Sequence, residues 1–436
     1  MKKSHYAVSM VITLLLCTVA ATACAQTGEE AVSNVATLGL EPDLEYSFER
    51  QHPLITCDAR GYHPSGKKVL YIMGGELDKS FQIVDMTTKE PVYEGLLTKL
   101  DVEDGEDHIY IGDFSDYTKE GEYRVYQQDV GYSGEFAIDK QLYREMYHQA
   151  YEIVKGTEYN TTSELMYVLS TLLLTHEIYD QAEFDRAFVA DKIKVLMGHQ
   201  DEESGAVSQE LQAEVISLSA TAEYAGLLAQ YYADFCEEDE EFALECLNLA
   251  EKAYLYLEQY ADNVSSDSLY YASSQLYRAT GQYKYRNAIE WYDSMEDSQR
   301  TVSDYDFTFL ADVAYLKSAY RTDYIRCESM MNRYLREMVA ISDTSDKLHY
   351  YVQSDIDELG EYEVLDNMMK LGLVSYVVSG REYASIQGNY MHYLLGLNGN
   401  QQNYIETGIG EDAIPVKDDI IAVSKLLFVL AGDYAI

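Results

Sequence analysis

The hydrophobic period of the chain changes near Asp139, and this change limits the fold more than any other feature. From Leu54 to Ile138, short runs alternate apolar and polar residues between Gly, Pro and Asp breaks, as in strands joined by turns. After Asp139 the period is about 3.6 residues, which is typical of amphipathic helices. The sequence therefore predicts a β-sandwich followed by an all-helical domain. The clearest strands are predicted at residues 69–73, 81–85, 108–111, 123–126 and 135–138.

Twelve helices are predicted after residue 140, bounded by Gly, Asn, Asp and Ser. A solenoid of helix pairs should repeat its sequence every ~34–47 residues, and no such repeat is present. We therefore expect a closed (α/α)6 barrel over residues 140–436, preceded by an immunoglobulin-like β-sandwich over residues 51–139. The helices are predicted near 141–155, 161–178, 182–198, 214–235, 239–260, 266–279, 282–295, 302–320, 322–340, 361–379, 381–396 and 418–431.

The N-terminus has the pattern of an export signal. Lys2 and Lys3 precede an apolar run that ends in small residues at Ala21–Ala25, so residues 1–24 are predicted to be a signal peptide. Two cleavage readings remain open: processing after an Ala-x-Ala sequence, and lipoprotein processing that leaves Cys24 as an acylated N-terminus. Residues 25–50 are acidic and weakly patterned, which predicts a linker. We expect an extracellular or cell-surface protein that contacts the membrane only through this lipid.

The charge and the tyrosine content narrow the classes of partner. The chain has 75 acidic and 32 basic residues and a net charge of −43. This charge repels nucleic acids and anionic lipids, so a nucleic-acid function is excluded. Forty-two tyrosines accompany a single tryptophan, and tyrosine suits wet grooves where sugar rings stack. However, most of these tyrosines recur at helical spacing, which favours packing between helices.

Several motifs follow one another in an order that is typical of a known protein family. The predicted β-sandwich contains Gly61-Tyr62-His63-Pro64, Asp113-Phe114-Ser115, Gly121-Glu122-Tyr123 and an exit strand at Gly131–Phe136. This order resembles the immunoglobulin-like module that precedes the catalytic barrel in many family 9 glycoside hydrolases, the family of many cellulases. The helical region resembles the same family, through a Ser/Thr-Ala-rich inner helix, a helix similar to its Tyr-Trp-Ala-Ala-x-Glu-Leu core, and its Leu-Gly-x-Asn and Thr-Gly-x-Gly segments. These segments are residues 219–225, 269–281, 393–398 and 404–410.

The catalytic motifs that this resemblance implies are largely missing. Inverting glycosidases use two carboxyl groups about 6.5–9.5 Å apart. The family's base lies in an Asp-Ala-Gly-Asp loop between the first two barrel helices, where this chain has only Thr157–Asn160. Counting back from the last helix places the family's acid at Lys417, so Asp418 and Asp419 are candidate acids. Alternatively, these two carboxylates stabilise the start of that helix by interacting with its dipole. The family's His/Arg segment, expected within residues 410–415, is also absent.

Three functions therefore remain open. The first is a catalytically impaired protein that binds a β-glucan or cellulose-type polysaccharide, the second an active endo- or exo-acting β-glycosidase with relocated carboxylates, and the third a non-catalytic surface scaffold. Tyr270, Tyr271 and Tyr404 are candidates for stacking on sugars and Asn398 for polar contacts, with packing as the alternative for each.

No cofactor or metal site is predicted with a recognised ligand spacing. Residues 101–107 are oxygen-rich enough for calcium, but they lack the ligand that an EF-hand loop places at position 12, so a hairpin tip is the simpler interpretation. Glu164 is expected to form a capping box with Thr161 at the start of the second helix.

Overall fold

The computed structural model describes most of the predicted two-part fold. It covers residues 55–104, 107–180, 182–260, 263–321, 323–348, 361–378, 384–398, 402–408 and 414–434. The predicted signal peptide, the linker and Cys24 lie outside these residues, so these assignments stay predictions. Within the described part of the chain, no helix is long and apolar enough to cross a membrane.

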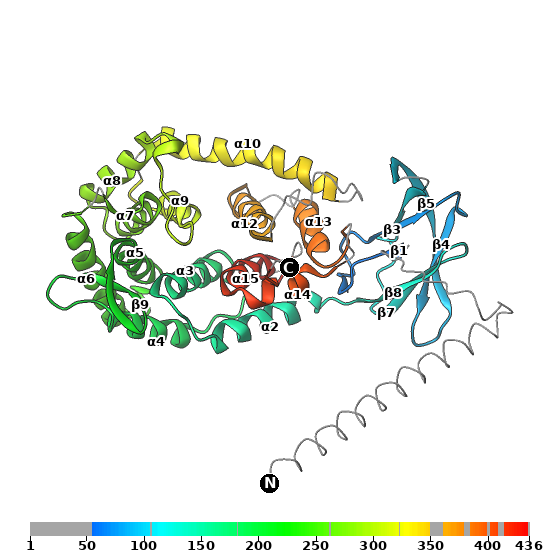
Figure 1. Ribbon diagram of the computed structural model, residues 1–436, viewed down its shortest axis with the longest axis horizontal. Coiled ribbons are helices and arrows are strands. Elements are labelled where there is room, and N and C mark those ends of the chain that lie inside the picture. The colour runs from blue at the N-terminus through cyan, green and yellow to red at the C-terminus, as the bar shows by residue number, and fades with distance from the viewer. Residues whose placement is uncertain are drawn as a thin grey trace, which may run out of the picture. The chain divides into compact units, whose positions relative to one another are not determined.

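The N-terminal part is a β-sandwich whose two sheets share one long strand, β5 (Figure 1). The first half of β5 pairs with β4 as far as Leu96, and its second half pairs with β6 from Leu97 onward. The core between the sheets includes Tyr62, Phe114 and Phe136, with edge-to-face ring contacts around Tyr62. The strands are β1 (Ile55–Thr56), β2 (Gly61–Tyr62), β3 (Val69–Gly74), β4 (Ser80–Asp85), β5 (Pro91–Asp104), β6 (Asp107–Asp113), β7 (Gly121–Gln127) and β8 (Gly131–Ile138).

The acidic segment predicted as a hairpin tip joins β5 and β6. These strands pair antiparallel down to Asp104 opposite Asp107, as a hairpin requires. Gly105 and Glu106 lie outside the described residues, so the calcium alternative stays a prediction. The predicted β-sandwich is confirmed.

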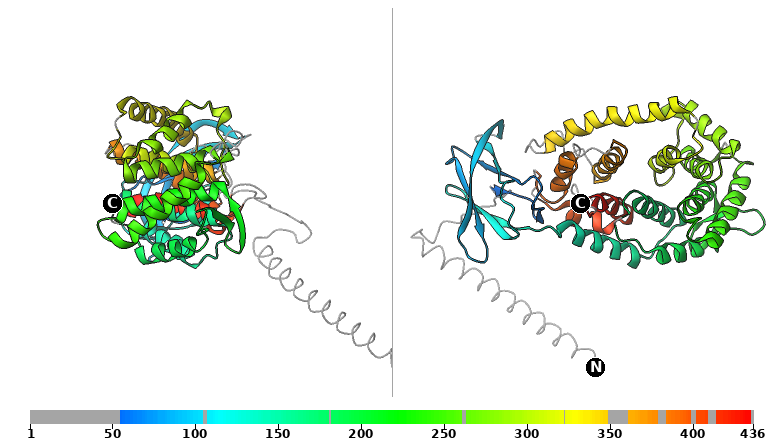
Figure 2. Two further views of the ribbon diagram at one scale, coloured as in Figure 1. Left: turned by 90° about the vertical axis from the view of Figure 1, so that its left-hand side faces the viewer. Right: turned by 180° about the vertical axis from the view of Figure 1, so that it is seen from behind.

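The second part consists of inner helices that are buried on nearly all sides and outer helices that bury one stripe. Figure 1 shows the inner helices around a common centre, and Figure 2 shows the same arrangement from behind. This pairing confirms the predicted (α/α)6 barrel. The inner helices are α3 (Thr162–Ile178), α5 (Leu218–Phe235), α7 (Ser266–Thr280), α9 (Thr308–Lys317), α12 (Glu361–Val378) and α15 (Ile420–Tyr434). The outer helices are α2 (Leu142–Gly156), α4 (Arg186–Met197), α6 (Glu240–Leu257), α8 (Tyr283–Ser294), α10 (Tyr324–Leu348) and α13 (Ala384–Leu394).

Small residues let the inner helices approach closely. α5 carries Ala222, Ala225 and Gly226 within a few residues, and Gly226 faces the ring of Tyr271 on α7. A Cβ atom at Gly226 would lie 2.3 Å from that ring, so this contact requires glycine. The last helix, α15, packs against both α2 and α3 and thereby closes the ring, whereas α9 and α12 pack sparsely against one another.

The inner helices end at a common side, where four charged residues form the base cluster: Glu177, Asp234, Arg278 and Lys317. Arg278 Nη1 donates to Glu177 Oε2 at 3.2 Å, and Arg278 Nη2 donates to Asp234 Oδ1 at 2.8 Å. Lys317 Nζ lies 2.9 Å from Glu177 Oε1. The two cations also face the negative ends of the helix dipoles. The base cluster therefore ties together four consecutive inner helices.

Three predicted helix starts are wrong, because the helices expected to begin at residues 182, 214 and 302 begin only at Arg186, Leu218 and Thr308. Residues 214–217 were expected to begin a helix, but they belong to β10 (Ala213–Ser217), which pairs with β9 (Val207–Glu210). α5 begins only at Leu218, because the Ser217 hydroxyl accepts a hydrogen bond from Ala220 N and caps the helix there. Val215 and Ile216 are β-branched, which suits the strand.

Candidate functional site

The inner helices begin at the side opposite the base cluster, which we call the mouth of the barrel. The β9–β10 hairpin lies across the first turns of α3 and α5 at this mouth. The Thr162 hydroxyl donates to the carbonyl oxygens of Ser208 and Gln209 at 2.8 and 2.9 Å, and Val207 N donates to the Thr221 hydroxyl at 2.9 Å. The hairpin is therefore fixed to the mouth by two inner helices.

A groove of about 620 Å³ opens beside this hairpin, and we call it the hairpin groove. Its volume falls in the ~300–1,000 Å³ range of typical ligand pockets. Gln200 holds its inner wall, because Gln200 Nε2 donates to the carbonyl oxygens of Gly205 and Leu249. The groove combines polar groups with the partly exposed apolar surface of Leu211 and Ile216. Its lining consists of Gly198, His199, Gln200, Asp201, Glu202, Ala206, Ser208, Leu211, Gln212 and Ile216.

Buried carboxyl groups and serine hydroxyls form a second feature of the mouth, the serine–carboxyl cluster. Its members are Ser163 on α3, Glu223 on α5, Asp267 and Ser268 on α7, and Ser303 in the connection before α9. Ser268 Oγ donates to Glu223 Oε1 at 3.0 Å. Asp267 accepts from Ser303 N and Ser303 Oγ, each at 3.0 Å, and so holds that connection against α7.

Burial dominates the electrostatics of this cluster. Desolvation raises the pKa of the Glu223 carboxyl to about 7, although hydrogen bonds from Ser163, Ser268 and Ser303 oppose the shift. Desolvation also raises the pKa of Asp267, against hydrogen bonds that favour its ionised form. Both carboxyl groups are fully enclosed, so a polysaccharide cannot reach them in this conformation. The cluster therefore supports the structure of the mouth and makes no direct contact with a polysaccharide in this conformation.

A smaller cavity of about 180 Å³ lies where α9 and α12 pack sparsely, and we call it the α9–α12 cavity. Three cations and four carboxylates line it, and each cation has a carboxylate partner. Lys425 Nζ lies 2.6 Å from Asp366 Oδ1, Lys370 Nζ lies 3.1 Å from Glu337 Oε2, and Arg333 pairs with Asp312. The lining consists of Tyr167, Asp306, Thr308, Phe309, Asp312, Arg333, Tyr334, Glu337, Asp366, Met369, Lys370 and Lys425.

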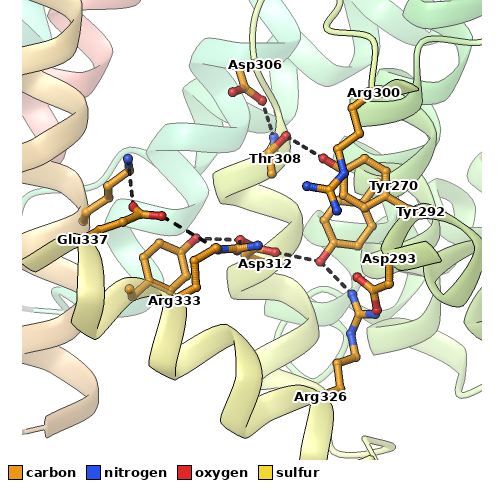
Figure 3. A network of polar contacts seen from close by, with 12 residues as sticks. Tyr270, Tyr292, Asp293, Arg300, Asp306, Thr308, Asp312, Arg326, Arg333 and Glu337 are labelled. Carbon is orange, nitrogen blue, oxygen red and sulfur yellow. Dashed lines mark hydrogen bonds and ion pairs between the residues drawn. The ribbon is translucent and has the colours of Figure 1, made fainter. Parts of the chain in front are cut away.

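Asp312 anchors the wall of this cavity, as Figure 3 shows. The hydroxyl groups of Tyr270 and Tyr334 each donate to its carboxylate at 2.7 Å. Burial raises the pKa of Asp312, and the nearby charge of Arg333 lowers it in part. Arg326 Nη2 in turn donates to the Tyr270 hydroxyl at 3.0 Å. Because a buried carboxylate with these partners stays in place, the wall is preorganised.

The candidate acids at the start of α15 have different surroundings. Asp419 accepts hydrogen bonds from Ile421 N at 2.9 Å and Ala422 N at 3.1 Å, so its carboxylate caps the helix. Asp418 is exposed in the short 3₁₀ turn η3 (Val416–Asp418). The geometry supports the capping alternative for Asp419, and within the described residues no hydrogen bond or ion pair holds the Asp418 carboxyl group in place for proton transfer.

The connection between α2 and α3 is as short as the sequence predicts. It comprises residues 157–161, in which Glu158 is the sole carboxylate and is exposed. Thr161 caps α3 as expected, because its hydroxyl accepts from Glu164 N at 3.0 Å. The Glu164 carboxylate accepts from Asn160 N at 2.9 Å rather than from Thr161 N, so the reciprocal bond of the capping box reaches one residue further back.

The four residues proposed for sugar contacts lie in packed positions. Tyr270, Tyr271, Tyr404 and Asn398 are 2%, 0%, 2% and 5% exposed. The ring of Tyr270 stacks on Tyr292 with centroids 4.1 Å apart. Asn398 Nδ2 donates to the carbonyl oxygens of Tyr393 and Gln402, both at 2.7 Å. The packing alternative therefore describes these side chains in the structure, and no sugar can stack on the three rings in this conformation.

Two features, the buried Glu223 and the α9–α12 cavity, were not predicted. The sequence contains a local signal for the first of them only. Glu223 is the lone charge in the run Ala220–Ala225, which otherwise holds three alanines, a threonine and a tyrosine and lies on an inner helix. The α9–α12 cavity had no local signal, because its lining comes from segments far apart in the sequence.

Comparison with solved structures supports the fold. A metagenome-derived glycoside hydrolase family 9 endoglucanase superposes with a TM-score of 0.72 at 17% identity, covering 88% of this chain and 99% of that one. A family 9 protein from Bacteroides ovatus gives a TM-score of 0.69 at 15% identity over 88% of this chain and 99% of that one. A mutant thermostable endoglucanase from Alicyclobacillus acidocaldarius gives 0.69 at 17% identity over 88% and 100%. No curated protein sequence matches the chain.

Family models match both parts of the sequence and confirm the predicted resemblance. Residues 50–131 match the model of the cellulase N-terminal immunoglobulin-like domain. Residues 142–416 match the model of glycosyl hydrolase family 9. Because the second match spans more than half of the sequence, the chain belongs to glycosyl hydrolase family 9.

Proposed function

We propose that this family 9 protein binds a β-glucan chain across the mouth of its barrel and has lost most or all of the family's hydrolytic activity. The observation that carries the proposal is the five-residue α2–α3 connection, which has one exposed carboxylate, Glu158, in place of an Asp-Ala-Gly-Asp loop. A general base or acid contributes about 10²–10⁴-fold in rate. Losing the base therefore lowers hydrolysis far more than it lowers binding.

The site of the proposed acid supports the same conclusion. Asp419 uses its carboxylate to cap α15, because that carboxylate accepts two backbone N–H bonds at the start of the helix. A general acid must instead face the leaving-group oxygen of the bound substrate and donate a proton to it. Impaired proton donation at this position adds to the loss of the base.

The hairpin groove supports retained binding. Its volume of about 620 Å³ has room for more than one sugar ring, and it lies beside the hairpin that is bonded to α3 and α5. His199, Glu202 and Gln212 offer polar groups, while Ile216 offers an apolar surface against which a pyranose ring can pack. Family membership indicates a polysaccharide of the β-glucan type as the ligand.

Binding and cleavage can be measured separately. We expect the purified protein to be retained by soluble β-glucans in affinity electrophoresis and to release no reducing sugar above background. The variant Gln212→Ala/Ile216→Ala should lose retention, while Gln259→Ala, outside the groove, should keep it. Reducing-sugar release that disappears in Asp418→Asn/Asp419→Asn would overturn the impaired-enzyme proposal in favour of an active glycosidase. If the protein shows neither retention nor release of reducing sugar, the result would favour the scaffold.

We further propose that the protein is exported and carries a lipid on Cys24. The support is the sequence pattern of residues 1–24 alone. We expect a clickable palmitate analogue to label the full-length protein in an expressing bacterium and Cys24→Ala to abolish the label. Labelling that persists in this variant, or a processed wild-type protein without label, would contradict lipidation. The second result would favour Ala-x-Ala cleavage.

A further inference from the structure

We propose that the β-sandwich supplies a second contact for the β-glucan chain, on the outer face of the sheet formed by β4, β7, β8 and the first half of β5. This inference rests on the proposed function, because it assigns another contact to the same ligand. The face carries a row of paired side chains that crosses all four strands, which we call the outer row. Its members are Glu94 on β5, Gln82 on β4, Tyr126 on β7 and Tyr132 on β8.

A bulge in β8 places Tyr132 on this face. Alternate residues of a regular strand face the same side, so counting back from the buried Phe136 would turn Tyr132 toward the core. However, β8 has one extra residue between its pairs with Arg124 and Tyr126. The Ser133 hydroxyl accepts a hydrogen bond from the facing backbone N–H of β7 at 2.8 Å. The bulge therefore brings Tyr132, which is 54% exposed, beside Tyr126 on the outer face.

The two tyrosines form an aromatic surface against which sugar rings can pack. Their ring centroids lie 4.8 Å apart and their planes are tilted by 42°. The guanidinium carbon of Arg124 lies 3.7 Å from the centre of the Tyr132 ring and steadies that ring from one side. A tyrosine ring offers an apolar body to the C–H groups of a sugar, while its hydroxyl stays in water. The tilt between the rings suits a single chain better than the flat surface of packed chains.

The other members of the outer row offer hydrogen bonds to sugar hydroxyls. The Gln82 amide can both donate and accept, and the Glu94 carboxylate accepts. Within the described residues, no hydrogen bond or ion pair holds the side chains of Gln82, Glu94 or Arg124. These groups are therefore available to a ligand that brings its own donors and acceptors.

The charges of the face favour a neutral chain. Arg124 on β7 has acidic residues on both sides of its strand, Glu94 on β5 and Glu135 on β8. An anionic polymer is repelled by these carboxylates and by the net charge of −43. Leu96 is 75% exposed on the same face, but Gln82 and Glu94 separate it from the two tyrosines. The alternation of polar and aromatic groups therefore fits a glycan better than an apolar protein surface.

The outer row is long enough for more than one sugar ring. Neighbouring strands lie about 4.8 Å apart, so three spacings give roughly 14 Å. Among the described strands, β2 borders the other side of β8, and it pairs only with Ala137 and Ile138, away from Tyr132. The row is therefore open at this end. A long chain can bind the outer row and the hairpin groove together, and linked contacts strengthen binding by about 10²–10⁴-fold.

Affinity electrophoresis of the purified protein in hydroxyethyl cellulose, a soluble β-glucan, tests the outer row. We expect Tyr126→Thr/Tyr132→Thr, the row variant, to raise the apparent Kd for the polymer at least about tenfold, because one of two linked contacts is lost. Threonine keeps the preference of these positions for a strand. The matched control is Tyr283→Thr/Tyr324→Thr, which removes rings that are 66% and 79% exposed on α8 and α10 and should leave retention unchanged.

Thermal unfolding should show that both variants remain folded. If the row variant unfolds, Tyr132→Thr alone replaces it and should also weaken retention. Unchanged retention in a folded row variant, with retention lost in Gln212→Ala/Ile216→Ala, would overturn this inference alone. The reverse pattern would overturn the proposed binding at the mouth alone, and a wild-type protein without retention would overturn both. Sedimentation that shows dimers of the wild type and monomers of the row variant would overturn the inference in favour of self-association.

Discussion

Replacing Arg278 by methionine is expected to destabilise the helical domain by about 3–5 kcal/mol, because it leaves a buried carboxylate without its cation. Arg278 bonds both Glu177 and Asp234 in the base cluster, where its side chain is 11% exposed and that of Asp234 is 5% exposed. Burial and the charge of Glu177 already raise the pKa of Asp234, and the loss of Arg278 raises it further. Urea unfolding followed by circular dichroism at neutral pH measures the change in free energy.

The control for this prediction is Arg286→Met, which removes an ion pair with Glu290 on the surface of α8. Surface pairs of this kind contribute about 0–1 kcal/mol. The double variant Arg278→Met/Asp234→Asn should regain part of the lost stability, because it removes the stranded charge. Equal destabilisation by Arg278→Met and Arg286→Met would contradict the role assigned to the base cluster.

Replacing Glu223 by glutamine is expected to stabilise the protein above pH 7 by up to about 3 kcal/mol, since each unit of pKa shift corresponds to 1.36 kcal/mol. Burial raises the pKa of Glu223 from 4.5 to about 7. Between these values the folded chain keeps a proton that the unfolded chain has lost, so wild-type stability falls as pH rises through this window and is level above it. Glutamine cannot ionise, and Ser268 can still donate to its amide oxygen.

Unfolding free energies measured from pH 4 to pH 8 test this prediction. The variant and the wild type should differ least at the acidic end and most above pH 7. Glu158→Gln, at an exposed position in the α2–α3 connection, is the control. Parallel pH profiles for Glu223→Gln and the wild type would show that the Glu223 carboxyl is already ionised in the folded protein near pH 5.

Most of the fold could be predicted because its signals are local. The inner helices α3 and α15 have long apolar runs, and most predicted helix ranges lie close to the observed ones, although α10 continues to Leu348 where the prediction ended at residue 340. Strand β5 was not predicted, because it changes sheets between Leu96 and Leu97 and so does not keep one face buried. Strand β9 was not predicted, and most of β10 was predicted as the start of a helix, because its five residues with two β-branched side chains merge with the apolar period of α5.

The candidate site was less predictable because it depends on contacts between distant segments. The missing loop between α2 and α3 could be read directly, since a motif and its absence are local. The stacking role expected for Tyr270 came from its place in a motif, but Asp312 and Arg326, which hold its hydroxyl, come from other helices. The partners of Lys425 and Arg333 likewise follow from the ring of helices and from no spacing in the sequence.

The closure of the ring by α15 has a consequence for how the domain is assembled. The last inner helix covers apolar faces of α2 and α3, which are the first helices of the domain to be synthesised. Contacts between such distant segments slow folding, and an unfinished barrel exposes apolar surface that favours aggregation. The fifteen residues of α15 are thus needed to complete the barrel. A chain that stops before Ile420 should yield an aggregating intermediate rather than a smaller working domain.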